Sequence, residues 1–182
     1  LRFDPPGFAA DGGPTALSIG TAMHTALQRL PLGPLDRAGA AAFIQSLHAR
    51  RLIGEAEAAA LDPEALSWFS QTPLYERLCA SRRAERELSF TYALAAAALY
   101  DTAAEERVLL QGVIDACYLE EDGWVLIDYK TDAPRPGDSE EALKDRHSQQ
   151  IHLYAAALAA LTKQPVKQCY VVYLSHRKCI AC

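Results

Sequence analysis

Apolar residues in the first part of the chain recur every three to four positions, as they do on the buried face of an amphipathic helix. The first such segment begins near Ser18 or Thr21 and stops before Pro31, because proline cannot continue a helix. Its predicted buried stripe is Met23, Ala26, Leu27 and Leu30. Glycines and prolines separate further predicted helices over 37–50, 55–61, 63–70 and 73–80.

The pattern then changes to the alternation of polar and apolar residues that is typical of β-strands. It predicts strands over 86–92, 108–119 and 124–130, with Glu120 to Gly123 as a hairpin loop between the last two. The remaining predicted elements are a surface loop with Pro134, Pro136 and Gly137, an amphipathic helix over 147–161 and a strand over 168–175. Helices, a strand meander, a helix and a strand predict a mixed α/β domain.

The length of the chain suits a single domain. Its 182 residues can build one sizeable core but not two. We expect 1–17 to be an extended lead-in, 18–176 to be the domain and 177–182 to be a tail. The chain begins with leucine rather than methionine, so we expect it to be a fragment of a longer protein. No apolar run approaches the ~20 residues of a membrane span, and we expect no membrane partner.

The charge balance argues against a protein that holds nucleic acid through a broad basic surface, because the net charge is −5. Basic residues gather locally within 82–86 and within 144–147, where they either contact a nucleic acid or form solvated helix faces. A role with nucleic acid must therefore depend on a local site or on neighbouring domains.

The five cysteines are scattered and odd in number, which argues against a disulfide framework and favours a reducing, cytoplasmic setting. Cys179 and Cys182 form one CxxC at the end of the chain. A single pair is a weak signal for a metal or iron–sulfur cluster, and an unstructured tail is the simpler interpretation.

The predicted hairpin brings two aspartates together. Counted outward from the turn, with Leu119 facing Trp124, the register places Asp115 directly across from Asp128. Side chains at opposed positions share a face, with Cβ atoms roughly 4.5–5.5 Å apart. Two carboxylates so close repel each other, so either one of them holds a proton or a cation lies between them.

Lys130 lies two residues after Asp128 and so points to the same face of the strand. Two acids and an ammonium suit a hard divalent cation such as Mg²⁺, and the lysine can neutralise developing charge or position a water. Two alternatives stay open from spacing alone. Asp128 and Lys130 can form an ordinary exposed ion pair, or a bulge can turn Asp115 to the other face.

These motifs resemble the core of the PD-(D/E)xK nuclease superfamily, and within it the C-terminal nuclease domain of AddA-type, RecB-like bacterial helicase–nucleases. The resemblance depends most on Gly112-Val113-Ile114-Asp115 followed by Asp128-Tyr129-Lys130-Thr131-Asp132. Weaker matches are Gly20–His24, Arg86–Phe90 and the Gln-x-x-x-Tyr helix Gln150–Tyr154. The resemblance covers 18–175 and implies a restriction-endonuclease-like core, with a central mixed sheet flanked by helices and an N-terminal helical part.

The resemblance also implies roles for individual residues. The implied metal ligands are His24, Asp115, Asp128 and the backbone carbonyl of Tyr129. Asp115, Asp128 and Lys130 would form the catalytic set, with Lys130 acting on the nucleophilic water. Glu87 would support the site, and Gln150 and Tyr154 would contact DNA or brace the active site. The implied metal is Mg²⁺, with Mn²⁺ as a substitute.

Each supporting residue also has an ordinary structural interpretation. His24 can be a satisfied histidine at a packing interface, Glu87 an ion partner of Arg86, and Tyr154 a core residue. Ile114 stands where the superfamily is named for proline. AddB-type relatives carry an iron–sulfur cluster on one early and three late cysteines, and this sequence lacks that set, which argues against such a cluster.

The implied function is that of a Mg²⁺-dependent DNA exonuclease within a helicase–nuclease that processes double-strand DNA ends for recombinational repair. The expected partners are single-stranded DNA, the helicase domains of the parent chain and an AddB-type subunit. The sequence has no Gly-x-x-x-x-Gly-Lys-Ser/Thr loop, so this chain is not the motor. The alternatives are a catalytically silent nuclease-like module for DNA binding or subunit docking, and a metal-dependent hydrolase of another substrate.

Overall fold

The computed structural model describes residues 13–95, 107–131 and 139–182. Two parts of the sequence interpretation lie outside the described residues: most of the lead-in, over 1–12, and the loop with Pro134, Pro136 and Gly137. Within the described residues, no helix is long and apolar enough to span a bilayer.

Helix α1 (Ala16–Gln28) begins earlier than its apolar stripe predicted. Thr15 is the N-cap, and its side chain accepts a hydrogen bond from the backbone N–H of Ser18 at 3.1 Å. The cap lies outside the buried stripe, so apolar spacing alone placed the start too late. The predicted stripe itself is confirmed, because Met23, Ala26, Leu27 and Leu30 are all buried.

The next four helices follow the sequence prediction closely. Asp62 and Thr72 cap the two helices that begin with proline, which loses no hydrogen bond at that position. The helices are α2 (Arg37–Ala49), α3 (Glu55–Ala60), α4 (Pro63–Ser70) and α5 (Pro73–Ala80).

Helix α6 (Glu140–Thr162) is longer than predicted, since it begins at Glu140 rather than at 147. Ser139 is its N-cap, and two glutamates in the first turn fit the positive end of the helix dipole. Its first two turns are polar apart from Ala142 and Leu143, so they carry no apolar stripe to predict them.

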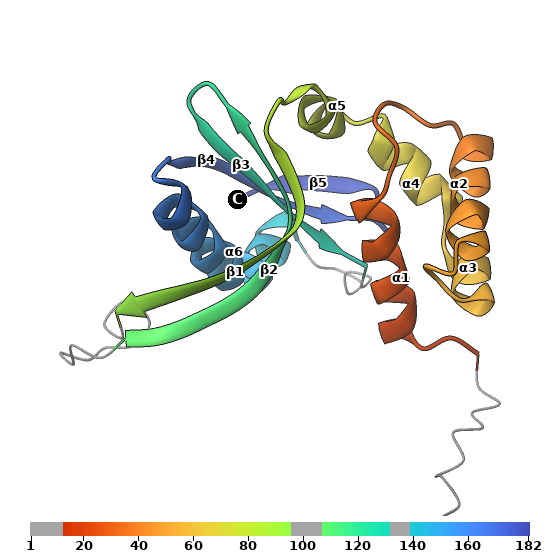
Figure 1. The fold of residues 1–182 in the computed structure, drawn as a ribbon, viewed down its shortest axis with the longest axis horizontal. Helices are drawn as coiled ribbons and strands as arrows, with labels where there is room; N and C mark the ends of the chain where they lie inside the picture. The colour runs from red at the N-terminus through yellow and green to blue at the C-terminus, as the bar shows by residue number, and fades with distance from the viewer. Residues whose placement is uncertain (1–12, 96–106, 132–138) are drawn as a thin grey trace, which may run out of the picture.

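Five strands form one mixed sheet in the order β1-β2-β3-β4-β5 (Figure 1). Neighbouring strands are antiparallel except β3 and β4, which are parallel and joined through α6. The strands are β1 (Ala84–Ala95), β2 (Arg107–Glu120), β3 (Gly123–Lys130), β4 (Val166–Tyr173) and β5 (Lys178–Ala181).

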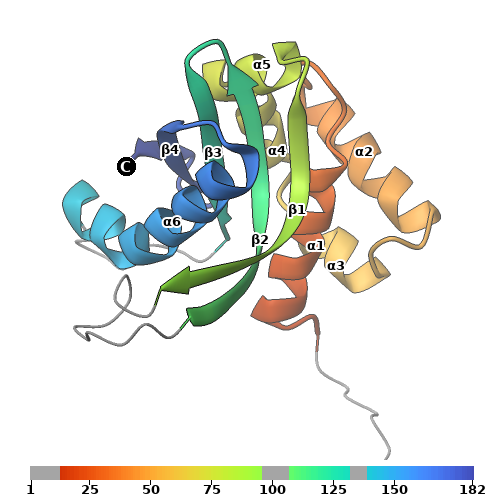
Figure 2. The ribbon, with the colours of Figure 1, turned by 60° about the vertical axis from the view of Figure 1, so that its left-hand side comes forward.

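The sheet separates two apolar cores. The larger core joins α1 to α5 to one face of the sheet through residues such as Tyr118, Val125 and Ile127. The smaller core joins α6 to the opposite face through residues such as Leu126 and Val171. Figure 2 shows α6 on one side of the sheet and α1 to α5 on the other. This α/β arrangement with an N-terminal helical part confirms the predicted fold class.

Two further details of the sequence interpretation are wrong. The hairpin loop has two residues rather than four, because Glu120 pairs with Gly123, although the predicted pairing of Leu119 with Trp124 is confirmed. Residues 178–181 are not an unstructured tail but form β5, which pairs with β4. This short strand follows a polar turn and is completed by pairing, so its own sequence gave no alternation to detect.

Candidate active site

Strands β2 and β3 part at the point where the two aspartates lie. The antiparallel pairing ends with Ala116 opposite Ile127. The next residues on the two strands, Asp115 and Asp128, are not paired with each other. Asp115 Oδ2 instead accepts a hydrogen bond from the backbone N–H of Tyr129 at 2.7 Å. The register was therefore predicted correctly, but the direct pairing of the two aspartates was wrong because the strands separate there.

The alternation of side chains breaks at the same place. Ile114 packs into the α6 core, whereas Ala116 packs into the core of α1 to α5, although an unbroken strand would put both on one face. On β1, Glu87 has a left-handed backbone with φ 57° and does not pair with Asp115. This matched irregularity on β1 and β2 frees Glu87 and Asp115 from the regular pleat.

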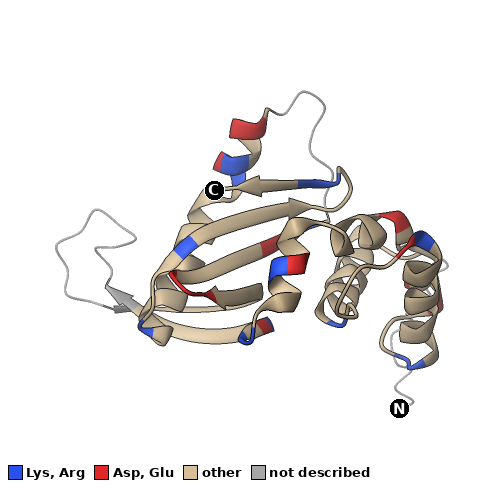
Figure 3. Cartoon of the chain, turned by 90° about the horizontal axis from the view of Figure 1, so that it is seen from above, with Lys and Arg blue, Asp and Glu red and all other residues tan. Residues whose placement is uncertain are grey.

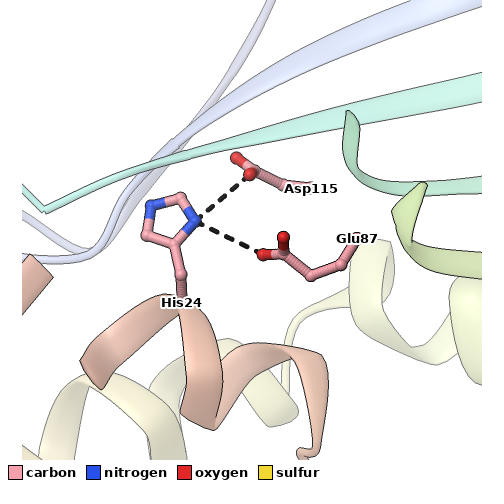
Figure 4. Close-up of side chains that lie close together, drawn as sticks. All are labelled: His24, Glu87 and Asp115. Carbon is pink, nitrogen blue, oxygen red and sulfur yellow. Dashed lines mark ion pairs between the residues drawn. The ribbon is translucent and has the colours of Figure 1, made fainter. Parts of the chain in front are cut away.

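The freed carboxylates lie next to a histidine of α1. His24 Nδ1 is 3.1 Å from Asp115 Oδ1 and 3.8 Å from Glu87 Oε1. Figure 4 shows both carboxylates pointing toward the imidazole. Among the described residues, these three form the group of potential metal ligands whose donor atoms all lie within 4.8 Å of one another. Asp128 does not belong to this group, and Glu87 is a donor within it rather than an ion partner of Arg86.

The negative charge of the carboxylates affects the pKa values within this group. The hydrogen bond to Asp115 raises the pKa of His24 above its usual value, against the opposing effect of burial. Burial raises the pKa of Glu87, and the nearby charge of Asp115 adds to the increase. The group therefore carries crowded negative charge that favours a cation, whether a proton or a metal ion.

A second group extends from β3 to α6. Asp128 is only 4% exposed, and its Oδ2 lies 2.9 Å from Lys130 Nζ. The same ammonium donates to Gln150 Oε1 at 3.0 Å, and Gln150 Nε2 donates to the Tyr154 hydroxyl at 3.3 Å. Burial raises the pKa of Asp128, while Lys130 lowers it. The pair is thus buried and linked to α6, unlike the exposed ion pair considered as an alternative.

Both groups border one open pocket of about 420 Å³. It lies where the strands part, so α1 contributes from one face of the sheet and α6 from the other. Glu87 belongs to the first group but is not among the residues that line the pocket. The lining residues are His24, Val113, Asp115, Asp128, Tyr129, Lys130, Thr131, Gln150 and Tyr154.

The donor set of this pocket fits a divalent cation. Carboxylate oxygens are the ligands that Mg²⁺ and Mn²⁺ prefer, and an imidazole nitrogen is also accepted by Mn²⁺. The imidazole of His24 and the carboxylates of Glu87 and Asp115 can supply three ligands. This number leaves room for water and substrate oxygens on the metal. The ammonium of Lys130 lines the same pocket, where it can meet an anion.

A larger hollow, of about 920 Å³, lies elsewhere, at the end of the β2–β3 hairpin. Its principal charges neutralise each other, because Glu120 receives two hydrogen bonds from Arg77 and contacts Lys167. No cluster of potential metal ligands was found there among the described residues. Size therefore does not identify the site, whereas the chemistry of the smaller pocket does.

Sequence reasoning assigned no role to two residues of the pocket wall, Val113 and Thr131. Both belong to the motifs that carry the resemblance, with Thr131 next to Lys130 and Val113 two residues before Asp115, so their positions were the available signal. Gly20 also has a local role, because a Cβ added there would lie 3.1 Å from Thr131 Oγ1. This close approach sets α1 against the end of β3.

Comparison with known proteins places the fold and the motifs in a family. The sequence pattern of the PD-(D/E)XK nuclease superfamily matches residues 5–179. A curated ATP-dependent helicase/nuclease subunit from Geobacillus kaustophilus is 38% identical over 179 residues. Proteins with the same name from Desulforamulus reducens and Listeria innocua are 38% and 34% identical over 168 and 182 residues.

These matches cover nearly all of this chain but a small part of each relative. The shares of this chain are 93%, 90% and 95%, and the shares of the relatives are 14%, 13% and 15%. The chain therefore corresponds to one region of much longer proteins.

Proposed function

Because the chain belongs to the PD-(D/E)XK nuclease superfamily, whose members use divalent metals, we propose that it is a Mg²⁺-dependent deoxyribonuclease domain that hydrolyses phosphodiester bonds. One observation carries the proposal. His24 and Asp115 on one side, and Asp128 and Lys130 on the other, line a single pocket where the sheet opens.

In this proposal His24 and Asp115 bind the metal, with Asp128 and the carbonyl of Tyr129 as further ligands. The distances support Glu87 as a third close donor rather than only a supporting residue, since its Oε1 is 3.8 Å from His24 Nδ1. When bound, the metal would polarise the phosphate and lower the pKa of a water molecule. Mg²⁺ is the proposed physiological ion, and Mn²⁺ would substitute for it.

Lys130 is the proposed cationic group of the reaction. Its ammonium has three N–H donors, of which one faces Asp128 and one is donated to Gln150. The third can donate to a phosphate oxygen or orient the attacking water. Gln150 and Tyr154 brace the lysine, because Gln150 bonds both of them. A fixed ammonium stabilises developing negative charge better than a mobile one.

The wider role follows from the relatives. Since the matching region is a small part of helicase/nuclease subunits, we propose that this chain is the nuclease region of such a protein in the cytoplasm. It would act as an exonuclease on single-stranded DNA supplied by the helicase domains, with a partner of the AddB type. The assembly would process double-strand ends for recombinational repair.

The test is cleavage of single- and double-stranded DNA by the purified chain with and without Mg²⁺ or Mn²⁺. Asp128→Asn and Lys130→Gln should each lower kcat by about 100-fold or more, since each removes charge that the reaction needs. Asp122, in the turn of the distant hairpin, and Lys167 of β4 also form an aspartate–lysine ion pair, so Asp122→Asn and Lys167→Gln are control variants that should keep activity.

The alternatives predict other outcomes. A silent module for DNA binding or docking would leave DNA uncut and give no calorimetric signal with Mn²⁺. A hydrolase of another substrate would bind Mn²⁺ and leave both forms of DNA intact. Either result would overturn the proposed function.

A further inference from the structure

Arg86 joins the helix that carries His24 to the strand that carries Glu87. Its Nη1 donates to the carbonyl of Leu30 at 2.7 Å and to that of Gln28 at 3.3 Å. Leu27 offers a third, longer contact at 3.5 Å. These carbonyls belong to the last turn of α1 and the residues just after it, where backbone carbonyls have no regular i+4 partner within the helix.

Tyr75 of α5 completes this contact. Arg86 Nη2 donates to the Tyr75 hydroxyl at 3.0 Å, and the guanidinium lies 5.4 Å from the centre of the ring. The hydroxyl in turn lies within donating distance of the carbonyls of Leu30 and Pro31, at 3.0 and 2.9 Å. Tyr75 is fully buried, and burial raises its pKa to about 12, so it remains a donor at neutral pH.

The position of Arg86 in the sheet connects this clamp to the site. Arg86 precedes Glu87 and pairs with Ala116, the neighbour of Asp115. His24 lies about one helical turn before the clamped carbonyls. The last turn of α1 has no basic residue of its own, so its negative end is balanced by a side chain from β1. Arg86 is thus adjacent to Glu87 on β1, and its cross-strand partner Ala116 is adjacent to Asp115 on β2.

From this geometry we propose that Arg86 is a positioning residue, which fixes α1 against β1 and so holds His24 at ligand distance from Asp115 and Glu87. The inference rests on the proposed function, because it concerns the metal-binding competence of the same group. Arg86 touches neither the pocket nor the three donor atoms in any described contact. In this proposal it acts through the elements that it joins, α1, α5 and β1, rather than through direct contact with the donors.

The chemistry of arginine suits this task better than that of lysine. A planar guanidinium reaches several carbonyls and the Tyr75 hydroxyl at fixed angles, while its flat face lies over the aromatic ring. A lysine ammonium at the same position would keep the charge but lose the fork. Arg86→Lys therefore separates geometry from charge.

The test is isothermal titration of Mn²⁺ into the full chain, with DNA cleavage as a second readout. We expect Arg86→Lys to weaken Mn²⁺ binding about tenfold and to lower kcat by a similar factor, as changes behind metal ligands do. The KM for DNA should stay within about twofold of the unmodified value, because the pocket wall is intact. Tyr75→Phe should shift the same quantities in the same direction by a smaller factor.

Arg77→Gln is the matched control. It also removes an arginine that joins a helix to the sheet, through Glu120, but at the distant hairpin. We expect it to lower thermal stability and leave Mn²⁺ affinity unchanged. A role of Arg86 in stability alone would give Arg86→Lys the same behaviour. Folded Arg86→Lys protein that binds Mn²⁺ with unchanged affinity would overturn the inference.

The same two measurements distinguish a failure of the proposed nuclease function from a failure of the positioning role of Arg86. Unmodified chain that neither binds Mn²⁺ nor cuts DNA would refute the proposed function itself. Unmodified chain that does both, together with an Arg86→Lys variant that matches it, would refute only the positioning role.

Discussion

Glu87 combines an unusual backbone with an unusual side-chain environment. Its φ of 57° lies in the left-handed region that side chains other than glycine rarely occupy. Burial and the charge of Asp115 both raise its pKa, so the ionised form is disfavoured as well. A residue retained under two such penalties is expected to serve binding rather than stability.

From the strained backbone and the disfavoured charge of Glu87 we derive a prediction for Glu87→Gly. Glycine adopts φ 57° without the cost of about 1–2 kcal/mol that a side chain carries there, and removal of the carboxylate relieves repulsion with Asp115. We expect the metal-free variant to unfold in urea at least as late as the unmodified chain. Its Mn²⁺ affinity should fall about tenfold, because a close donor is lost.

Glu85→Gly is the control for this prediction. Glu85 is exposed on the same strand and is not among the described residues with positive φ. Glycine there should cost about 0.5–1 kcal/mol of stability and leave Mn²⁺ binding unchanged. A Glu87→Gly variant that unfolds earlier than Glu85→Gly would contradict the strain assigned to Glu87.

For individual residues, the sequence predicted which side chains belong to the site better than it predicted their contacts. It named Asp115, Asp128 and Lys130 from strand spacing, and all three line the pocket. Strand periodicity could not show that Glu87 lies beside His24, because that contact needs a local break of the pleat. The role of Arg86 was equally hidden, since its partners are backbone carbonyls more than 50 residues away.

Helix α6 packs against strands β1 and β2 at Gly112, where a side chain would not fit. A Cβ added to Gly112 would lie 3.0 Å from ring atoms of both Phe90 and Tyr154. These rings contact each other edge to face at 5.2 Å between centroids. Because Tyr154 accepts a hydrogen bond from Gln150, any shift of its ring reaches the lysine side of the pocket.

We therefore predict that Gly112→Ala destabilises the chain by about 1–3 kcal/mol, the usual cost of overpacking. Urea unfolding measures this loss, and cleavage assays should show a parallel decrease in kcat. A second substitution, Phe90→Leu, makes room for the added methyl group and should restore part of both quantities. Gly13→Ala, where nothing lies within 4 Å, is the control. Equal stability of the two alanine variants would refute the packing argument.

The hairpin supplies a prediction about pH. Arg77, and then Lys167, lower the pKa of Glu120 to about 2 from an ordinary value of 4.5. A carboxyl with a lower pKa in the folded state stabilises the fold above its unfolded pKa, and this contribution is lost as the pH falls through the folded pKa. The loss should therefore occur between about pH 4.5 and pH 2.

Glu120→Gln should remove that dependence. We expect the variant to be less stable at pH 7 by up to about 1 kcal/mol, since the network is partly exposed to solvent. Its melting temperature should fall less steeply than that of the unmodified chain below pH 4.5. Glu121→Gln, at the exposed neighbouring position in the turn, is the control and should keep the original profile. Parallel profiles for Glu120→Gln and the unmodified chain would contradict the assignment.

The bounds of a helix or strand were predictable where the residues of that element themselves carry the start signal or the apolar spacing. Helices α4 and α5 match their predicted bounds, because proline and a capping residue mark each start. The polar first turns of α6 and the short strand β5 were missed, since a cap stabilises one and a neighbouring strand the other. The separation of β2 from β3 was also missed, because it depends on Asp115 bonding the backbone of Tyr129.

At the scale of the whole molecule, charge limits how the chain can meet its substrate. The net charge is −5, and Figure 3 shows basic and acidic residues interspersed along the described elements. Several basic side chains are already paired with carboxylates, among them Arg37, Arg77 and Lys167. The proposed catalytic pocket itself contributes one lysine, Lys130. For the proposed DNA substrate, this charge distribution favours delivery to the domain over capture by it.

From this charge distribution we predict weak binding of DNA by the isolated chain, with a shallow dependence on salt. Each phosphate contact on a single strand changes the slope of log K against log salt by about −0.7, so few contacts give a slope of about −2 or shallower. Fluorescence anisotropy of a labelled single strand across a NaCl series measures it, with Ca²⁺ in place of Mg²⁺ to hold back cleavage. Submicromolar affinity with a slope steeper than about −5 would show a broad cationic surface that the described residues do not provide.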